Sequence, residues 1–189
     1  ETVDGEHMMT ETVVGADIGV AVIGMGNMGT RHLAILKRLG VARTIAVSQQ
    51  PERLTHLKDT GVIIARNLSE WSEPRPALGI VASNTGRHAA DALEALAHGL
   101  DLLVEKPLAV TAEEAARIRE AAAKAGRRVV VGCVLRFSES LNTFRRLLDR
   151  VGTLHSVAIE CRAYLPEWRT ARPYRETYSA RADEGGVLR

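Results

Sequence analysis

The chain has 189 residues, and its 25 Lys and Arg residues against 23 Asp and Glu residues give a net charge of +2. These charges are spread along the chain without a basic stripe, and no apolar run approaches the roughly 20 residues of a membrane span, so we expect neither nucleic acid nor a membrane as a partner. Hydrophobic residues make up 46% of the chain, which is enough for a solid core in one large domain, or in one domain and part of another.

The N-terminal part predicts a leader, then a strand and a helix. Residues 1–16 are polar and lack periodicity, so we expect them to form a flexible leader. The apolar run 18–23 predicts a buried strand. Residues 28–39 predict a helix with its leucines on one face, stopped by Gly40.

Between this strand and helix lies the motif Gly24-Met25-Gly26-Asn27-Met28-Gly29. In this setting Gly24 allows a tight turn, Gly26 lets the backbone approach a pyrophosphate, and Gly29 lets the helix pack close to the strand. The exposed N–H groups at the helix start, including those of Asn27 and Met28, would hold the phosphates. The motif predicts a dinucleotide site, and its alternative is a glycine-rich turn without a ligand.

The end of the second predicted strand, 44–47, bears on the choice of cofactor. NAD sites place an Asp or Glu there to accept hydrogen bonds from the ribose 2′-hydroxyl, whereas this chain continues with Ser48 and Gln49. Both side chains can donate to a hydroxyl or to a phosphate. Arg53 would reach a 2′-phosphate, or it is a solvated charge on a helix face. This pattern slightly favours NADP over NAD and leaves both open.

The remaining elements alternate between strand and helix. The helix before Gly126 is the clearest, because Thr111 and Glu114 form a capping box at its start. The pattern predicts α/β architecture, a doubly wound parallel sheet in a Rossmann domain over 17–137. The expected helical segments are 51–59, 87–98 and 111–125, and the expected strands are 62–64, 78–82, 102–104 and 129–131.

Glu105-Lys106-Pro107 follows the predicted strand 102–104. Ligands of open α/β sheets bind at the carboxyl ends of strands, so Lys106 would point toward the cofactor cleft. Glu105 would pair with Lys106 or with a nearby arginine. The alternative is a solvated charge pair at the end of a strand.

Four motifs follow one another along the chain: the glycine motif, Ala82-Ser83-Asn84-x-x-x-His88, Glu105-Lys106-Pro107-Leu108-Ala109, and Val131-Gly132-x-x-x-Arg136-Phe137. Their order resembles that of the glucose–fructose oxidoreductase / inositol dehydrogenase family (Gfo/Idh/MocA), and the resemblance runs from about Ile18 to the last residue. The resemblance implies an enzyme that uses NAD or NADP to transfer a hydride to or from a hydroxyl or keto carbon of a sugar or cyclitol.

The resemblance also implies roles for individual residues. Lys106 would lie beside the nicotinamide and the reacting oxygen, as acid–base catalyst or as hydrogen-bond donor to a developing oxyanion. His88 would lie close to the cofactor, although a purely structural contact at a helix start is an equal alternative. The other implied cofactor contacts are Ala82, Ser83, Asn84, Glu105 and Pro107.

Residues 138–189 are expected to begin a second domain, for substrate binding and oligomerisation. An amphipathic helix is predicted over 140–150, and residues 154–162 alternate as a strand would. In the family this strand opens a large sheet, but about 50 residues are too few for it. We therefore interpret the chain as a Rossmann domain followed by an incomplete α+β second domain, which makes it a truncated enzyme. We expect the full-length enzyme to be a homo-oligomer and the present chain to be inactive alone.

Segment 164–175 combines aromatic residues with arginines, which suits an acidic or N-acylated sugar because arginine binds carboxylates and aromatic faces stack on sugar rings. The candidate substrate residues are Arg136, Trp168, Arg169 and Tyr174. An interdomain or oligomer surface loop is the alternative. Two other functions stay open: an NAD-dependent glycosidase of the same fold family, and a dinucleotide-binding fragment without chemistry.

Cys133 and Cys161 are far apart, each lies in a strand-like apolar stretch, and neither belongs to a Cys-x-x-Cys pair. We expect them to be small buried hydrophobic side chains of a cytoplasmic protein. The N-terminus shows no signal-peptide pattern, and we expect no metal site.

Overall fold

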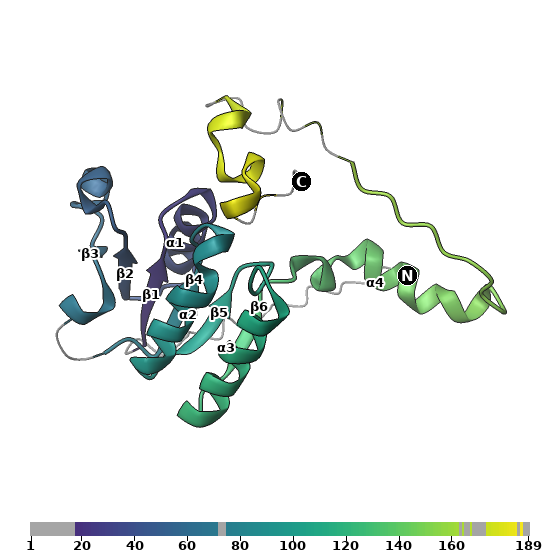
Figure 1. Cartoon of the computed structure of the whole chain (residues 1–189), viewed down its shortest axis with the longest axis horizontal. Coiled ribbons are helices and arrows are strands. Elements are labelled where there is room, and N and C mark those ends of the chain that lie inside the picture. Colours follow the sequence, from purple (N-terminus) through teal and green to yellow (C-terminus); the bar gives the residue numbers. More distant parts are fainter. Residues whose placement is uncertain are drawn as a thin grey trace, which may run out of the picture.

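The computed structural model describes residues 18–71, 75–162, 164, 167, 173–184 and 186. Six parallel strands form one sheet in the order β3-β2-β1-β4-β5-β6, from left to right in Figure 1. The strands are β1 (Gly19–Ile23), β2 (Arg43–Val47), β3 (Ile63–Ala65), β4 (Leu78–Val81), β5 (Asp101–Val104) and β6 (Val129–Val131). This order confirms the predicted Rossmann architecture.

Within the described residues, four α-helices and eight short 3₁₀ segments connect or follow the strands. The α-helices are α1 (Asn27–Arg38), α2 (His88–Ala97), α3 (Ala112–Ala125) and α4 (Glu139–Leu147). The 3₁₀ segments are η1 (Pro51–Leu57), η2 (Leu68–Glu70), η3 (Thr85–Arg87), η4 (Val134–Phe137), η5 (Leu148–Arg150), η6 (Tyr174–Glu176), η7 (Tyr178–Ala180) and η8 (Ala182–Glu184). The predicted helix over 140–150 is formed as α4 and η5.

Both faces of the sheet are buried, because the strand residues alternate between two cores. Val20 and Val22 of β1 pack with Leu33 and Leu36 of α1 on one face. Ala21 and Ile23 face the opposite side, where α2 and α3 supply the covering residues, Ile118 among them. A sheet with helices on both faces is the doubly wound arrangement that the sequence predicts.

An ion pair ties the starts of β5 and β6 together. The Asp101 carboxylate accepts hydrogen bonds from the backbone N–H of Arg128 at 2.9 Å and from its Nη2 at 2.8 Å. These bonds hold the pKa of the Asp101 carboxyl below its usual range. They fix the last strand of the sheet to its neighbour at the amino ends of the two strands.

The strand predicted over 154–162 is wrong: these residues form no strand and are exposed. Figure 1 shows the stretch running away from the sheet toward the C-terminal 3₁₀ segments. A strand needs the N–H and C=O groups of a neighbouring strand, and the described residues place none beside it. Val157 and Ile159 therefore remain exposed, Ile159 by 90%.

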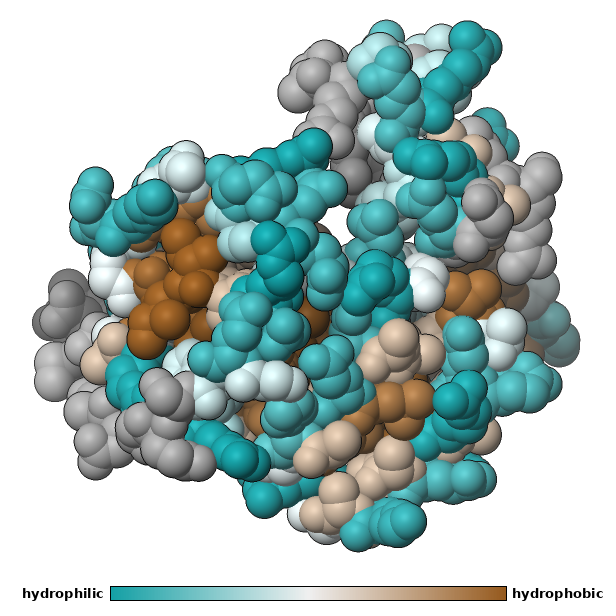
Figure 2. Space-filling model, turned by 60° about the vertical axis from the view of Figure 1, so that its left-hand side comes forward, coloured by the Kyte–Doolittle hydropathy of each residue, from teal (hydrophilic) through white to brown (hydrophobic). Residues whose placement is uncertain are grey.

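The prediction of buried cysteines is also wrong, since Cys133 and Cys161 are both exposed. Each lies after the last strand, where the described residues build no further layer to cover it. Many apolar side chains share this exposure, and Figure 2 shows apolar patches among hydrophilic groups on one face. After β6 the exposed apolar residues include Val134, Leu135, Phe137, Leu141, Phe144 and Leu147.

Among the described residues, no helix has both the length and the hydrophobicity to cross a membrane.

The capping box of α3 is formed as the sequence predicts. The Thr111 hydroxyl accepts the backbone N–H of Glu114 at 3.2 Å, and the Glu114 carboxylate accepts the N–H of Thr111 at 3.3 Å and that of Val110 at 3.0 Å. Gly126 ends the helix with φ of 63°, in the left-handed region that glycine favours. Both ends of the helix are thus satisfied by local sequence.

We expect Thr111→Ala to lower the free energy of unfolding by about 1 kcal/mol, because the N–H of Glu114 loses its acceptor. Urea denaturation followed by circular dichroism measures this change. The exposed Thr55, whose side chain makes no hydrogen bond within the described part of the chain, supplies the control Thr55→Ala, which should change stability by less than about 0.5 kcal/mol. Equal effects of the two substitutions would contradict the capping role.

Candidate functional site

The candidate site lies at the carboxyl ends of the strands, where the chain order of the sheet reverses between β1 and β4. Backbone hydrogen bonds continue past the strand ends and fix the loops there. The N–H of Gly24 donates to Val47 at 2.9 Å, that of Ala82 to Ile23 at 2.8 Å, and that of Glu105 to Val81 at 2.9 Å. The predicted glycine, Ala82-Ser83-Asn84 and Glu105-Lys106-Pro107 motifs therefore meet along one edge.

The three glycines of the first motif differ in what surrounds them. Gly24 has φ of +90°, and a Cβ there would lie 2.4 Å from the Cα of Ser83. A Cβ on Gly29 would lie 2.0 Å from the carbonyl oxygen of Gly24. At Gly26 a Cβ would meet nothing within 4 Å. The first and third glycines are thus required for packing, whereas the second faces open space that a ligand can enter.

The start of α1 has unpaired backbone donors. Its first intrahelical bond runs from Thr30 N–H to the Gly26 carbonyl at 3.0 Å, so the N–H groups of Asn27, Met28 and Gly29 have no acceptor within the helix. Gly26 provides no side-chain cap, and no acidic residue lies in the first turn. This terminus of a 12-residue helix is therefore suited to an anion.

Ser83 supplies a second polar group at this edge. Its Oγ is buried and has no hydrogen-bond partner among the described residues. A buried hydroxyl without a partner costs about 1–3 kcal/mol, which a polar ligand atom would recover. Together with the open space at Gly26 and the α1 terminus, Ser83 shows that these residues fit the phosphates of a dinucleotide.

Glu105 pairs with a histidine that the sequence analysis did not select. His32 Nε2 donates to Glu105 Oε1 at 2.8 Å, and both side chains are largely buried. Neither Lys106 nor an arginine is the partner, so that expectation is wrong. His32 lies one helical turn after Gly29, on the helix that starts at the glycine turn, and this position is the sequence signal that could have identified it. The pair ties α1 to the end of β5.

His88 makes a structural contact, which the sequence analysis gave as the alternative to a place close to the cofactor. Its side chain is almost fully buried, and its ring nitrogens lie 2.7 Å from the carbonyl oxygen of Pro107 and 3.0 Å from that of Ser83. The peptide bond between Lys106 and Pro107 is cis. His88 thus holds the loop after β4 against the loop after β5.

Lys106 itself is exposed, and its ammonium makes no hydrogen bond or ion pair with the described residues. Its two neighbours are anchored, Glu105 by His32 and Pro107 by His88. The backbone position of Lys106 is therefore fixed while its charged end is open to a ligand.

The predicted residues at the end of β2 lie at the same edge. The backbone N–H of Ser48 donates to Ala65 at 3.0 Å, and the Ser48 hydroxyl accepts the N–H of Gln50 at 3.1 Å. Gln49 is exposed, as is Arg53 in η1. The side chain of Arg53 contacts no other described group through a hydrogen bond or ion pair.

The candidate substrate residues are not brought together by the described part of the chain. Arg136 lies exposed in η4, and Trp168 and Arg169 lie outside the described residues. Tyr174 begins η6, in the C-terminal segment that ends with η8. This segment reaches the loop after β4, because η8 contacts η3. A Cβ on Gly86 of η3 would lie 3.3 Å from the backbone of Glu184 in η8.

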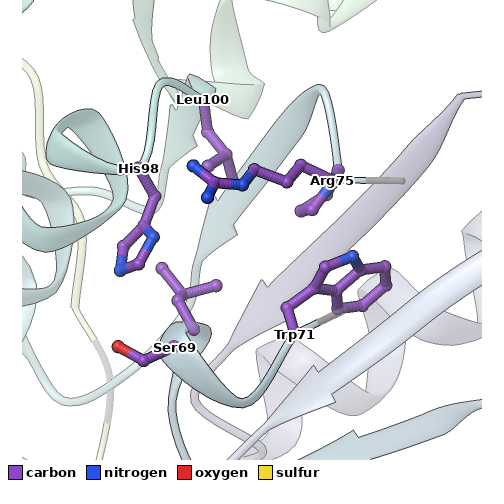
Figure 3. A pocket seen from close by; sticks show the side chains of 7 residues that line it. Ser69, Trp71, Arg75, His98 and Leu100 are labelled. Atoms are coloured by element: carbon purple, nitrogen blue, oxygen red, sulfur yellow. The ribbon is translucent and has the colours of Figure 1, made fainter. Parts of the chain in front are cut away.

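A small pocket of about 50 Å³ lies elsewhere. Figure 3 shows Ser69, Trp71, Arg75, His98 and Leu100 around it. Leu100 comes just before β5, so the pocket is at the amino ends of the strands, opposite the glycine turn. It is also too small for a dinucleotide.

Comparison with known proteins identifies the family to which this chain belongs. The model of GFO_IDH_MocA, an oxidoreductase family with an NAD-binding Rossmann fold, matches residues 18–133. The chain belongs to this family. The resemblance carried by the glycine and Glu105-Lys106-Pro107 motifs is thereby confirmed, as is the expected cofactor class, NAD or NADP.

Curated relatives include inositol 2-dehydrogenases. The enzyme of Burkholderia multivorans is 36% identical over 139 residues, which cover 69% of this chain and 41% of the relative. That of Streptomyces avermitilis is 32% identical over 138 residues, covering 70% of this chain and 40% of the relative. The chain thus spans about two fifths of the length of these relatives.

Solved structures share the fold. An oxidoreductase candidate from Magnetospirillum magnetotacticum MS-1 aligns with a TM-score of 0.61 and 30% identity, covering 71% of this chain and 44% of its own. The WlbA dehydrogenase from Bordetella pertussis, solved with NADH and UDP-GlcNAcA, aligns with a TM-score of 0.63 and 23% identity, covering 70% and 43%.

We expect Gly26→Val to weaken dinucleotide binding about tenfold or more without unfolding the chain, because its side chain would fill only the space at the start of α1. Calorimetric titration with NADH and NADPH and a thermal melt measure the two effects. Gly29→Ala is the matched comparison and should lower the melting temperature, since its Cβ would overlap the Gly24 carbonyl. Unchanged affinity in Gly26→Val would show that the ligand does not approach this backbone.

Proposed function

We propose that this chain is the nucleotide-binding part of an NAD(P)-dependent dehydrogenase that acts on a hydroxyl or keto carbon of a sugar or cyclitol. The observation that carries the proposal is the anchoring of the loop after β5, which bears the exposed Lys106, by the bonds of His32 to Glu105 and of His88 to Pro107. The inositol 2-dehydrogenase relatives support a polyhydroxylated substrate.

The cofactor contacts in this proposal come from four loops. The N–H groups of the α1 start bind the pyrophosphate, and the loop after β2 binds the adenosine ribose. Ser83 donates from the loop after β4, and Lys106 lies after β5. The proposed residues of the cofactor-binding site are Gly24, Gly26, Asn27, Met28, Gly29, Ser48, Gln49, Ala82, Ser83, Asn84, His88, Glu105 and Pro107, and Lys106 is proposed to lie beside the nicotinamide. Among these, Gly24, Gly29, Glu105 and His88 act by shaping the loops.

The chemistry divides between cofactor and protein. A bound nicotinamide supplies the hydride acceptor or donor. Lys106 donates a hydrogen bond from Nζ to the substrate oxygen and holds or moves the proton that accompanies the change between hydroxyl and keto group. Glu105 and Pro107 keep this lysine in place, because Glu105 is bonded to His32 and Pro107 to His88.

Residues 138–189 begin the substrate and oligomerisation domain in this proposal. The exposed apolar side of α4, with Leu141, Phe144 and Leu147, supports a further layer of protein there. Arg136 and Tyr174 are the described candidates for substrate contacts, and an arginine would favour a substrate with an acidic group. The full enzyme is proposed to be a homo-oligomer.

Replacement of Lys106 tests the proposal. In the longest reading frame that contains this sequence, Lys106→Ala should lower kcat by about 100-fold or more, the range of general acid–base catalysis, and change dinucleotide affinity by less than about threefold. Steady-state assays of dinucleotide reduction with myo-inositol and with an acidic sugar measure turnover. The exposed Lys124 of α3 provides the control, Lys124→Ala, which should leave kcat unchanged.

Two results would contradict parts of the proposal. Unchanged turnover in Lys106→Ala would remove the lysine from the chemistry. Full turnover by the 189-residue chain alone would show that the site needs no second domain to exclude water from the nicotinamide.

A further inference from the structure

Arg66 reaches from the end of β3 to the loop after β2. Its Nη1 donates to the carbonyl oxygen of Gln49 at 2.9 Å. The backbone of Arg66 is fixed as well, because its N–H donates to Glu70 Oε2 at 2.7 Å. The guanidinium is therefore held over the end of β2, although its side chain remains 53% exposed.

The guanidinium of Arg66 has N–H groups that the bond to Gln49 does not use. One of its five N–H groups is used by Gln49. The carboxylate of Glu52 lies 4.0 Å from Nη2, and both side chains are more than half exposed. Such a loose, solvated pair contributes little stability, so an anion with better geometry would replace Glu52.

Ser48 adds a neutral donor beside this cation. Its Oγ accepts the N–H of Gln50, which leaves its own O–H to donate. Positions 48–50 carry no carboxylate, the group with which NAD sites bind the 2′-hydroxyl. The end of β2 thus offers a fixed guanidinium and a hydroxyl, next to the strand that ends in the glycine turn.

We propose that Arg66, together with Ser48, binds the 2′-phosphate of NADP and gives this chain its preference for NADP over NAD. This inference rests on the proposed function, since it requires a dinucleotide across the glycine turn. Guanidinium and phosphate match in charge and in planar hydrogen-bond geometry.

Arg66 is assigned this role in place of Arg53, the residue that the sequence suggests. The side chain of Arg53 has no fixing contact within the described residues and lies exposed on η1. Arg66 is already ordered by Gln49, so it loses less conformational freedom on binding. Glu52 would oppose the phosphate, because its carboxylate lies 4.0 Å from Nη2 of Arg66.

The test uses the 189-residue chain and four ligands, NADPH, NADH, 2′,5′-ADP and 5′-AMP. Calorimetric titrations at one ionic strength give the dissociation constants for the wild type and for Arg66→Gln, Arg53→Gln and Glu52→Gln. The adenosine phosphates test the 2′-phosphate contact without the nicotinamide. Thermal melts show that each variant is folded.

We expect Arg66→Gln to weaken NADPH and 2′,5′-ADP about tenfold or more, the scale of a charged hydrogen bond, and to change NADH and 5′-AMP by less than about twofold. Glu52→Gln should tighten the two 2′-phosphate ligands about two- to threefold, because it removes a like charge. Arg53→Gln, which removes one positive charge from η1, should change the affinities for all four ligands by less than about threefold.

Three results would overturn the inference. If Arg53→Gln weakens binding of NADPH and 2′,5′-ADP and Arg66→Gln does not, the residue that binds the 2′-phosphate is Arg53. If the wild type binds NADH as tightly as NADPH, no 2′-phosphate site exists, while the proposed function stands. If the wild type binds none of the four ligands, the proposed dinucleotide site is wrong, and this inference falls with it.

Discussion

The turn after β1 lies directly against the turn after β4, and the rest of the site depends on this contact. Gly24 approaches Ser83 so closely that a Cβ would lie 2.4 Å from the Cα of that serine. The contact exists because β1 and β4 are parallel neighbours, although 54 residues separate the end of one from the start of the other along the chain. Any side chain at position 24 would separate the strands at the point where the sheet reverses its order.

Two histidines, the buried His88 and the largely buried His32, extend this arrangement to the third loop. His32 connects the helix after the glycine turn to Glu105, and His88 connects the loop after β4 to Pro107. Lys106 lies between these two anchors, with its ammonium exposed. A loop that carries a reactive group needs such support, because catalysis requires the reacting atoms to be held within fractions of an ångström.

After β6, the described residues form regular structure only where local interactions are sufficient for it. α4 is formed, since its amphipathic pattern and the cap at Ser138 are local. Residues 154–162 are not a strand, since strand pairing requires a neighbour. The same absence of a covering layer within the described residues leaves Cys133, Cys161 and Ile159 exposed.

The sequence by itself determined everything that depends on short-range order. The spacing of Gly24, Gly26 and Gly29, the capping box of Thr111 and the apolar run 18–23 each specify a local conformation or a buried strand. The alternation of such strands and helices along the chain predicted the parallel doubly wound sheet. Only the tertiary structure decided the pairings of His32 with Glu105, of His88 with Pro107 and of Arg66 with Gln49. Each joins residues that are 17 or more positions apart, and the choice among the many charged and polar side chains depends on which strand ends the fold brings together.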